Sequence, residues 1–460
     1  MDQAVSRDRT RELADCVVGF GPRDLSAEDL AQLDGLILDH LGVALRGASL
    51  PWGVALAKWA APYDGTGRCV VFGTGLKVTA PVAGMANASA AHGMELDDTH
   101  DESITHPGAV VIATALAVGT ERRASGGDVL AAIVAGYEVM ARVGAATGAA
   151  DILERGFHPT ALFGGFGAAA VATKLMGLDA NQLCEAWGLM LSMAGGSMQF
   201  SQDPHGTVVK RLHGGYGAHN GTIAAQLAAG GLAGPAQAFD GIYGLCRNFG
   251  SEPDLTRLER GPDDAFEIHR ISYKPYPCCR LFHSTIDALR EVTGGFTLEH
   301  EQIETITVGG PAGLATQHMM TRPASMMAAQ YSLPYTLGAS LVAGPHDYEV
   351  FAEDRLGDTA ILDLADRVVA VEDAGMEAAF PQHFGSWVEI VLRNGDKRRK
   401  DVLDSYGTPA NPMPYDAIRE KFSGLVGAAV PGFDQAGAAA LARGISGLGD
   451  ISVLAAKFSQ

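Results

Sequence analysis

The chain has 460 residues, of which 47% are hydrophobic and 19% are charged, and its formal net charge is −19. This composition supports a large buried core and excludes a disordered chain, and the length suggests two or three domains. The negative charge, with no long basic face to offset it, argues against nucleic acid or an anionic membrane surface as a partner. An anionic substrate would therefore need a local basic pocket.

The pattern of cysteines and the first residues of the chain indicate the cellular compartment of the protein. The six cysteines include no CxxC pair, and the opening MDQAVSRDRTREL has no apolar signal region. No stretch reaches about 18 uninterrupted apolar residues, the length that spans a membrane. We therefore expect a cytoplasmic protein with free thiols and no membrane span.

The predicted elements of the first half are helices. In residues 25–47, Ser26 can cap a helix together with Asp29, and apolar residues follow at helical spacing. Residues 125–147 repeat this pattern, with Asp128 near the start. Two more Ala- and Gly-rich segments, 178–196 and 219–234, are apolar on most sides and predict buried helices.

The pattern changes after about residue 265. Residues 301–311 and 385–402 carry β-branched residues in alternation, and Asn394-Gly395 is a hairpin signal. Helical patterns return in 412–426 and 433–445. The sequence predicts a mainly α fold, with a large helical domain built from both chain ends and a smaller inserted α+β domain. The predicted boundaries are 1–267, 268–400 and 401–460.

The first segment with candidate chemistry is HGMELDDTHDESITHPGAVV, residues 92–111. If its start is helical, Glu95 and Thr99 share one face at i and i+4, and His106 lies at a turn before Pro107 where it can face a cleft. An alternative is a turn segment whose aspartates bond to the backbone. Another is a metal site, with the ligands Asp97, Asp98, His100 and His106.

The second segment is GFHPTALFGGFGAAA, residues 156–170. His158 precedes Pro159, and Thr160 is expected to cap the following glycine-rich helix. The free N–H groups at such a helix start suit a carboxylate. A structural role for His158 is the alternative interpretation.

The third segment is DPHGTVVKRLHGGYGAHNG, residues 203–221. Lys210 and Arg211 share one helical turn with a histidine in an apolar, glycine-dense stretch. Lysine and arginine are seldom fully buried without partners, so they either reach solvent or meet a fixed anion. The histidines of this stretch favour a functional site: His205, His213 and His219.

The fourth segment, HRISYKPYPCCRLFHSTIDAL at 269–289, places Lys274 and Arg280 around a Cys-Cys pair. A vicinal Cys278–Cys279 disulfide would be strained, and no local feature supplies Cys279 with a base. We expect a loop that places the two cations on an anion. The chain has no phosphate-binding loop, no GxGxxG after a strand and no GxSxG elbow. The remaining repertoire suits acid–base catalysis on carboxylates.

The four segments, in this order, resemble the MmgE/PrpD family, which includes 2-methylcitrate dehydratases, cis-aconitate decarboxylases and iminodisuccinate epimerases. The resemblance runs over nearly the whole chain, through HGMELDDTH with THPG, GFHPTALFG, KRLHGGYGAHNG, KPYPCCRLFH and AQYSLPYTLGASL. It implies a helical domain from both chain ends with an α+β lid domain, a homodimer, and no organic cofactor or metal. The family's active positions fall on Glu95, Thr99, His106, His158, Lys210, Lys274, Cys279 and Tyr331.

The resemblance also frames a mechanism. Each of the three activities moves a proton at a carbon next to a carboxylate, so the developing enediolate needs fixed cations. We expect Lys210 and Lys274, with Arg280, to bind carboxylates, and His106 and His158 to act as acid and base. Tyr331 and Thr99 would position the leaving group or a water.

Three departures separate this chain from individual branches of the family. Glu95 and Cys279 stand where the decarboxylases carry aspartate and histidine, and His100 stands where the dehydratases usually carry tryptophan. We expect a hydro-lyase acting on a hydroxy-polycarboxylate. A dicarboxylate epimerase, a cis-aconitate decarboxylase and a non-catalytic carboxylate-binding protein are the alternatives.

Overall fold

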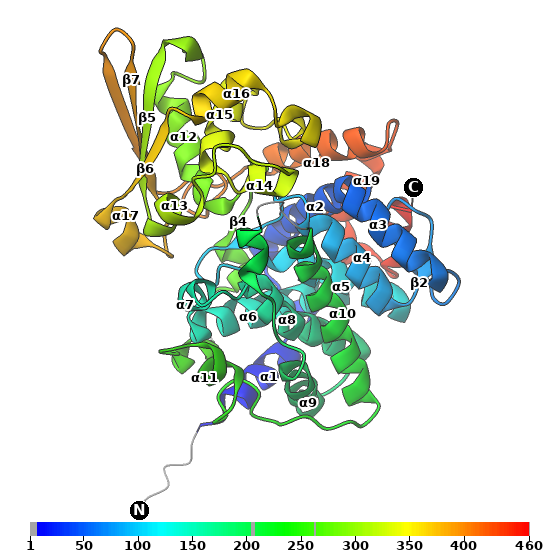
Figure 1. Ribbon diagram of the computed structural model, residues 1–460. Helices are drawn as coiled ribbons and strands as arrows, with labels where there is room; N and C mark the ends of the chain where they lie inside the picture. Colours follow the sequence, from blue (N-terminus) through cyan, green and yellow to red (C-terminus); the bar gives the residue numbers. More distant parts are fainter. Residues whose placement is uncertain (1–6, 204–207, 262–263, 460) are drawn as a thin grey trace, which may run out of the picture. The chain divides into compact units, whose positions relative to one another are not determined.

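A computed structural model describes residues 7–203, 208–261 and 264–459 of the chain. The chain divides into two compact units (Figure 1). Unit 1 comprises Met1–Met198, Val209–Ile271 and Pro414–Gln460, and unit 2 comprises Gln199–Val208 and Ser272–Met413. The described residues are mainly helical, as the sequence predicts.

Unit 1 is a helical assembly with short strands. Its helices are α1 (Arg9–Gly19), α2 (Ala27–Ala48), α3 (Pro51–Ala60), α4 (Ala80–His92), α5 (Pro107–Arg122), α6 (Gly126–Thr147), α7 (Ala149–Glu154), α8 (Pro159–Met176), α9 (Ala180–Leu191), α10 (Val209–Ala229), α11 (Leu245–Phe249), α18 (Tyr415–Ala429), α19 (Gln435–Arg443) and α20 (Ser452–Lys457). Its strands are β1 (Cys69–Val70), β2 (Lys77–Val78) and β3 (Thr99–His100), and β1 pairs antiparallel with β2.

Helix α2 starts where the capping signal predicts. The Ser26 hydroxyl accepts a hydrogen bond from the backbone N–H of Asp29 at 3.1 Å, and the Asp29 carboxylate accepts from the N–H of Ser26 at 2.8 Å. This reciprocal pair satisfies two N–H groups that the first turn leaves without helical partners. The N-terminal boundary of α2 is therefore fixed by local sequence.

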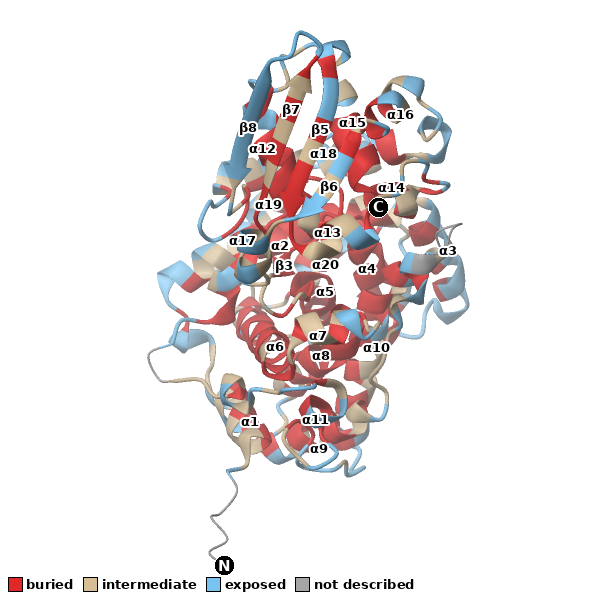
Figure 2. Ribbon diagram, turned by 60° about the vertical axis from the view of Figure 1, so that its left-hand side comes forward, coloured by how far each residue is buried: buried red, intermediate tan, exposed pale blue. Residues whose placement is uncertain are grey.

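Helices α5, α6 and α8 form the interior of unit 1, and they are almost entirely buried (Figure 2). Small residues let them pack closely: a Cβ added at Gly136 of α6 would lie 2.7 Å from side-chain carbons of both Val111 and Val171. Among the described residues, α6 is long and apolar enough to cross a membrane, but 94% of its most apolar window is buried inside the protein. Such burial is typical of a core helix.

Unit 2 combines a sheet with short helices. Its helices are α12 (His283–Val292), α13 (Ala312–Gln317), α14 (Met326–Gln330), α15 (Leu333–Ala343), α16 (Thr359–Ala365) and α17 (Ala374–Ala379). Its sheet contains β5 (Ile303–Gly310), β6 (Val368–Glu372), β7 (Ser386–Leu392) and β8 (Lys397–Val402), in the order β6-β5-β7-β8. The short strand β4 (Ile271–Ser272) stands where the chain passes from unit 1 to unit 2.

The sheet register shows why the hairpin signal was reliable. Strand β5 runs parallel to β6 and antiparallel to β7. Strands β7 and β8 pair antiparallel, with Val391 opposite Lys397, across a turn in which Gly395 has φ +91°. That left-handed conformation is costly for most residues and free for glycine.

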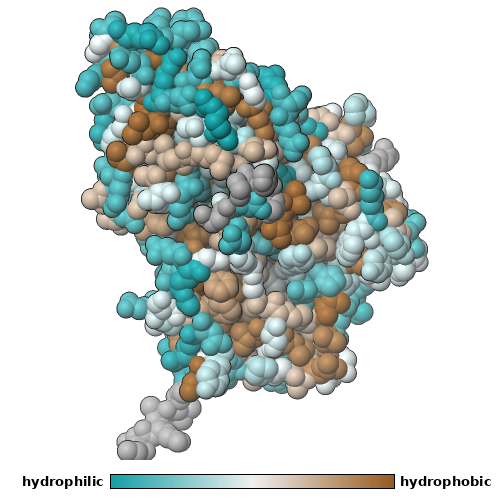
Figure 3. Space-filling model, in the orientation of Figure 1, coloured by the Kyte–Doolittle hydropathy of each residue, from teal (hydrophilic) through white to brown (hydrophobic). Residues whose placement is uncertain are grey.

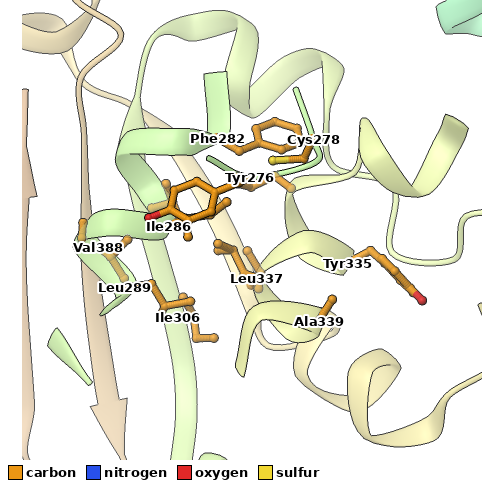
Figure 4. Close-up of a cluster of buried hydrophobic side chains, with 14 of the residues drawn as sticks. Tyr276, Cys278, Phe282, Ile286, Leu289, Ile306, Tyr335, Leu337, Ala339 and Val388 are labelled. Carbon is orange, nitrogen blue, oxygen red and sulfur yellow. The ribbon is translucent and has the colours of Figure 1, made fainter. Parts of the chain in front are cut away.

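The core of unit 2 lies between its sheet and its helices. Helix α12 packs on β7 and β8 and also contacts α15. Figure 4 shows Ile286 and Leu289 of α12 beside Val388 and Ile306 of the sheet, with Leu337 of α15 nearby. Alternate residues of β7 are buried, as expected for a strand with one face on a core.

Candidate functional site

The segment after α4 forms a loop rather than the helix that would put Glu95 and Thr99 on one face. Helix α4 ends at His92, and Glu95 has φ +55°, in the left-handed region. Thr99 belongs to β3 instead. A non-glycine residue at positive φ is uncommon and costs free energy unless its surroundings hold it there. The loop is therefore fixed by tertiary contacts, which no local pattern shows.

Glu95 forms an ion pair with Lys210, in the first turn of α10. The Lys210 ammonium donates a hydrogen bond to the Glu95 carboxylate, and both side chains are buried, at 0% and 1% exposure. Removing two charges from water costs several kcal/mol per ion, which the attraction between them only partly returns. An ion pair in such a place is therefore weak evidence for stability and favours a functional role.

Four histidines gather beside this ion pair. His92 is the last residue of α4, His106 and His158 precede Pro107 of α5 and Pro159 of α8 as helix N-caps, and His213 belongs to α10. Ring centroids are 5.0 Å apart for His92 and His106, 5.5 Å for His92 and His158, and 4.9 Å for His158 and His213. The rings thus form a continuous buried cluster drawn from four helices.

The environment holds two of these rings neutral. Burial keeps the pKa of His158 well below its usual range, and Lys210 and the neighbouring histidines lower it further, since a proton on His158 would be repelled by any positive charge that they carry. Burial and Lys210 lower the pKa of His213 to about 4. A neutral imidazole can accept a proton, so near pH 7 these rings suit the role of a base.

His106 is held from three sides. Its Nδ1 lies 2.9 Å from the carbonyl oxygen of Asp98 and 3.5 Å from a carboxylate oxygen of Asp97, and its backbone N–H donates to the Thr160 hydroxyl at 3.0 Å. Thr160 was expected to cap α8. The structure places His158 at that cap, and the Thr160 hydroxyl instead orients His106.

Asp98 anchors the start of α5. Its carboxylate accepts hydrogen bonds from the backbone N–H of Gly108 at 2.8 Å and from the hydroxyl of Tyr137. Burial raises the pKa of Asp98 to about 7. A Cβ at Gly108 would lie 2.7 Å from this carboxylate and from the Tyr137 oxygen, so only glycine fits there. Asp98 therefore has a structural role in placing the helix that follows His106.

Thr99 and His100 differ in their hydrogen-bond contacts. The Thr99 hydroxyl is buried and has no hydrogen-bond partner among the described residues. His100 contacts Ser103 at 2.9 Å and Glu267 at 3.2 Å, and its hydrogen bond is one of the causes that lower the pKa of Glu267 to about 2 despite burial. His100 thus belongs to a buried ionic network, and Thr99 is the residue with an unused polar group.

Three side chains around the same loop could act as ligands of a metal ion. Among the described residues, His92, Asp97 and His106 each place one possible ligand atom within 4.8 Å of the others. This set differs from the expected one, because Asp98 binds Tyr137 and His100 faces Glu267. A divalent ion there would compete with the hydrogen bonds that these side chains already make.

Four predicted site residues belong to unit 2. Lys274 is fully buried, and Cys279 donates its backbone N–H to the Gln330 carbonyl at 3.0 Å. Arg280 donates to the Ser405 hydroxyl at 2.9 Å. Tyr331 packs near two other rings, those of Phe200 and His318. All six cysteines are free thiols, Cys278 and Cys279 included.

The structure thus gathers Glu95, His106, His158 and Lys210 in unit 1, with Thr99 on the same loop. Sequence reasoning assigned no role to His92 and considered Asp97 only as a metal ligand or a turn residue, although both lie in the HGMELDD motif. Their five-residue spacing matches no familiar catalytic signature, so only the fold reveals their contact. His205 lies outside the described residues.

Comparison with known proteins places this site in a family. Residues 11–258 match the MmgE/PrpD N-terminal domain, and residues 276–443 match the MmgE/PrpD C-terminal domain. A cis-aconitate decarboxylase of Aspergillus terreus is 27% identical over 443 residues, covering 91% of this chain and 89% of the relative. The cis-aconitate decarboxylases of mouse and human are each 26% identical and cover 90% of this chain and 86% of their own length. The chain therefore belongs to the MmgE/PrpD family.

Proposed function

We propose that this protein is a lyase that acts on a small hydroxy-polycarboxylate, eliminating water through proton transfer at a carbon next to a carboxylate. The observation that carries the proposal is the buried Lys210–Glu95 ion pair beside four clustered imidazoles. Removing such a proton develops an enediolate, and a fixed, water-excluded cation stabilises that charge. Imidazoles can accept and return the proton near neutral pH.

The proposal gives each residue of unit 1 a role. His158 is the base, since burial, and then its neighbours, keep it neutral. His106 carries the proton to the leaving group, and the Lys210 ammonium faces the developing negative charge. The buried Thr99 hydroxyl, which has no hydrogen-bond partner among the described residues, is available to bind substrate. The roles of Lys274, Cys279 and Tyr331 stay predictions from the family resemblance, and the role of Arg280 stays a prediction from the residues of its own segment.

Decarboxylation is the second candidate. The curated relatives named above are cis-aconitate decarboxylases and match about nine-tenths of the chain. The same acid and base residues could catalyse decarboxylation, because loss of carbon dioxide also leaves a carbanion that must be protonated. The differences at Glu95 and Cys279 favour elimination of water, since a thiol cannot provide the cationic donor that an imidazole provides. Epimerisation of a dicarboxylate would need bases on both faces of the substrate.

One experiment separates these reactions. The purified protein is incubated in deuterated water with a panel of hydroxytricarboxylates, cis-aconitate and amino- or iminodicarboxylates, and followed by proton NMR. A new vinyl signal without loss of carbon dioxide supports the hydro-lyase. Carbon dioxide release indicates the decarboxylase, and deuterium incorporation without net elimination indicates an epimerase. Tight binding of a carboxylate with neither exchange nor turnover would contradict an enzymatic function.

We also propose that the protein is a homodimer. Helix α10 and the loop after it expose large apolar side chains: Val209, Tyr216, Leu227, Leu232, Ile242 and Tyr243. Figure 3 shows apolar residues on the surface of unit 1 in the region where Figure 1 places α10. Exposed apolar patches of this kind mark protein interfaces. Sedimentation equilibrium would show a dimer, and Tyr216→Glu should weaken it if this face is the contact.

A further inference from the structure

Asp97 lies between two histidines of the cluster. One carboxylate oxygen, Oδ2, is 2.7 Å from Nδ1 of His92 and 3.5 Å from Nδ1 of His106. The side chain of Asp97 is 3% exposed, and those of His92 and His106 are 0% and 10% exposed. Only His106 was expected to carry out chemistry. The arrangement therefore places a buried carboxylate, that of Asp97, next to the proposed proton carrier His106, and a second imidazole, that of His92, next to the carboxylate.

The acceptors determine which ring nitrogens carry hydrogen. A carbonyl oxygen can only accept a hydrogen bond, so Nδ1 of His106, 2.9 Å from the Asp98 carbonyl, must donate. A carboxylate also accepts, so Nδ1 of His92 donates to Asp97. Both rings then have Nε2 as the nitrogen that can take up a proton. The neighbours of Nδ1 thus select the tautomer of each ring.

The fold holds His92 firmly against Asp97. His92 ends α4, and α10 crosses it closely: a Cβ added at Gly214 would lie 3.0 Å from the Cβ of His92. The next residue, Gly93, leaves space for the indole of Trp52, whose Nε1 would be 2.3 Å from an added Cβ. Glycines on both sides allow this packing. The position of the His92 ring is therefore set by the backbone of two helices rather than by a mobile loop.

We propose that His92 and Asp97 are positioning residues for the proton transfer at His106. This inference rests on the proposed function. In the reaction, His158 takes the proton from a carbon next to a carboxylate, and the electron pair of the broken C–H bond stays on the substrate as an enediolate. The enediolate then forms the double bond as the C–O bond to the hydroxyl group breaks, and protonated His106 gives that hydroxyl the proton from its Nε2, so that it leaves as water. The N–H at Nδ1 stays in place throughout. The Asp98 carbonyl accepts that N–H at 2.9 Å, and the Asp97 carboxylate, 3.5 Å from Nδ1, stabilises the ring while it is positively charged.

His92 acts through Asp97. Its N–H occupies the Asp97 oxygen at 2.7 Å, which fixes the direction of the carboxylate toward His106. Because a nearby carboxylate stabilises a positively charged imidazole, losing its orientation should slow turnover more than it weakens substrate binding. A residue needed only for folding would not produce that difference.

The first test compares kcat and KM. Asp97→Asn keeps the size of the side chain and removes its charge, so we expect kcat to fall about 10- to 10³-fold, with KM changed less than about threefold. Asp101→Asn, four residues along the same loop, is the matched control and should keep kcat. An Asp97→Asn variant with wild-type kcat on a substrate that the wild type turns over would overturn the proposal.

The second test uses rescue at His92. The amide nitrogen of Asn can take the place of Nδ1, so His92→Asn should retain the hydrogen bond to Asp97, while His92→Leu cannot. We expect kcat of His92→Asn to exceed that of His92→Leu at least tenfold. Equal kcat values for the two variants would remove His92 from the proposal.

The third test does not depend on activity. Nitrogen-15 NMR of histidine-labelled protein reports which ring nitrogen carries hydrogen, and substitution assigns the signals. We expect both His92 and His106 to carry hydrogen on Nδ1 in the wild type. Hydrogen on Nε2 of either neutral ring would overturn the inference. If instead both tautomers are as expected and no polycarboxylate reacts, the proposed function fails while the assigned geometry stands.

Discussion

Lys421, in the C-terminal helix α18, donates a hydrogen bond of 2.7 Å to the carbonyl oxygen of Leu96. The same ammonium lies 2.7 Å from Oδ1 of Asp39 in α2. Leu96 directly follows Glu95, the residue at positive φ that pairs with Lys210. A residue near the C-terminus therefore helps to hold the loop that presents the buried glutamate.

Removing this lysine should destabilise the protein. Lys421→Met leaves the Asp39 carboxylate buried without its cation, and breaking a buried pair in this way costs about 3–5 kcal/mol. Urea unfolding followed by circular dichroism measures the loss. Arg419→Met, at an exposed pair with Asp416 on the same helix, is the matched control and should change stability by less than about 0.5 kcal/mol. Adding Asp39→Asn should recover part of the loss, and a double variant no more stable than Lys421→Met would contradict the pairing.

Lys210 should matter more for turnover than for folding. Lys210→Met removes the cation that faces the developing enediolate, so we expect kcat/KM to fall by at least about 10²-fold. The variant also leaves Glu95 buried without this partner, and it should unfold at lower temperature. Adding Glu95→Gln should restore thermal stability without restoring activity. If the double variant recovered both thermal stability and activity, the Lys210–Glu95 pair would have only a structural role.

Sequence reasoning succeeded where the signal was local. The capping residues Ser26 and Asp29 marked the start of α2, and the Asn394-Gly395 turn marked the β7–β8 hairpin. In each case the deciding hydrogen bonds or dihedral angles lie within a few residues. Such features depend on neighbouring residues alone, so a local sequence pattern can predict them.

Prediction from sequence failed where contacts between distant segments determine the local structure. Lys210 and Glu95 are 115 residues apart, and their ion pair holds a backbone conformation that the sequence of the loop does not favour. The expected helix through Glu95 and Thr99 was wrong for this reason. Thr160 was assigned to a helix cap, yet its hydroxyl binds the backbone of His106, 54 residues away.

Replacing His106 should lower the turnover rate and have little effect on the stability of the fold. His106→Ala removes the proton carrier, and general acid–base catalysis contributes about 10²–10⁴-fold, so kcat should fall by that factor. Its melting temperature should stay within a few degrees of the wild type. His300→Ala is a suitable control, because His300 lies outside the candidate segments, with its Nε2 3.4 Å from a carboxylate oxygen of the neighbouring Glu301. Full activity of the His106 variant would remove it from the mechanism.

The same reasoning predicts how acid destabilises unit 1. Both ring nitrogens of His40, in α2, lack a hydrogen-bond partner among the described residues, and burial lowers its pKa to about 4. The pKa of His40 is about 6.5 in the unfolded chain. At pH values between that value and the folded one, His40 is protonated in the unfolded chain and neutral in the folded protein. Stability therefore falls as pH drops through that window. His40→Leu removes this contribution, so its stability relative to the wild type should rise from pH 7.5 to pH 4 by roughly 3 kcal/mol. Val43→Ala, a buried neutral residue of the same helix, should shift stability equally at every pH. A pH-independent difference for His40→Leu in urea unfolding would show that His40 does not titrate in this way.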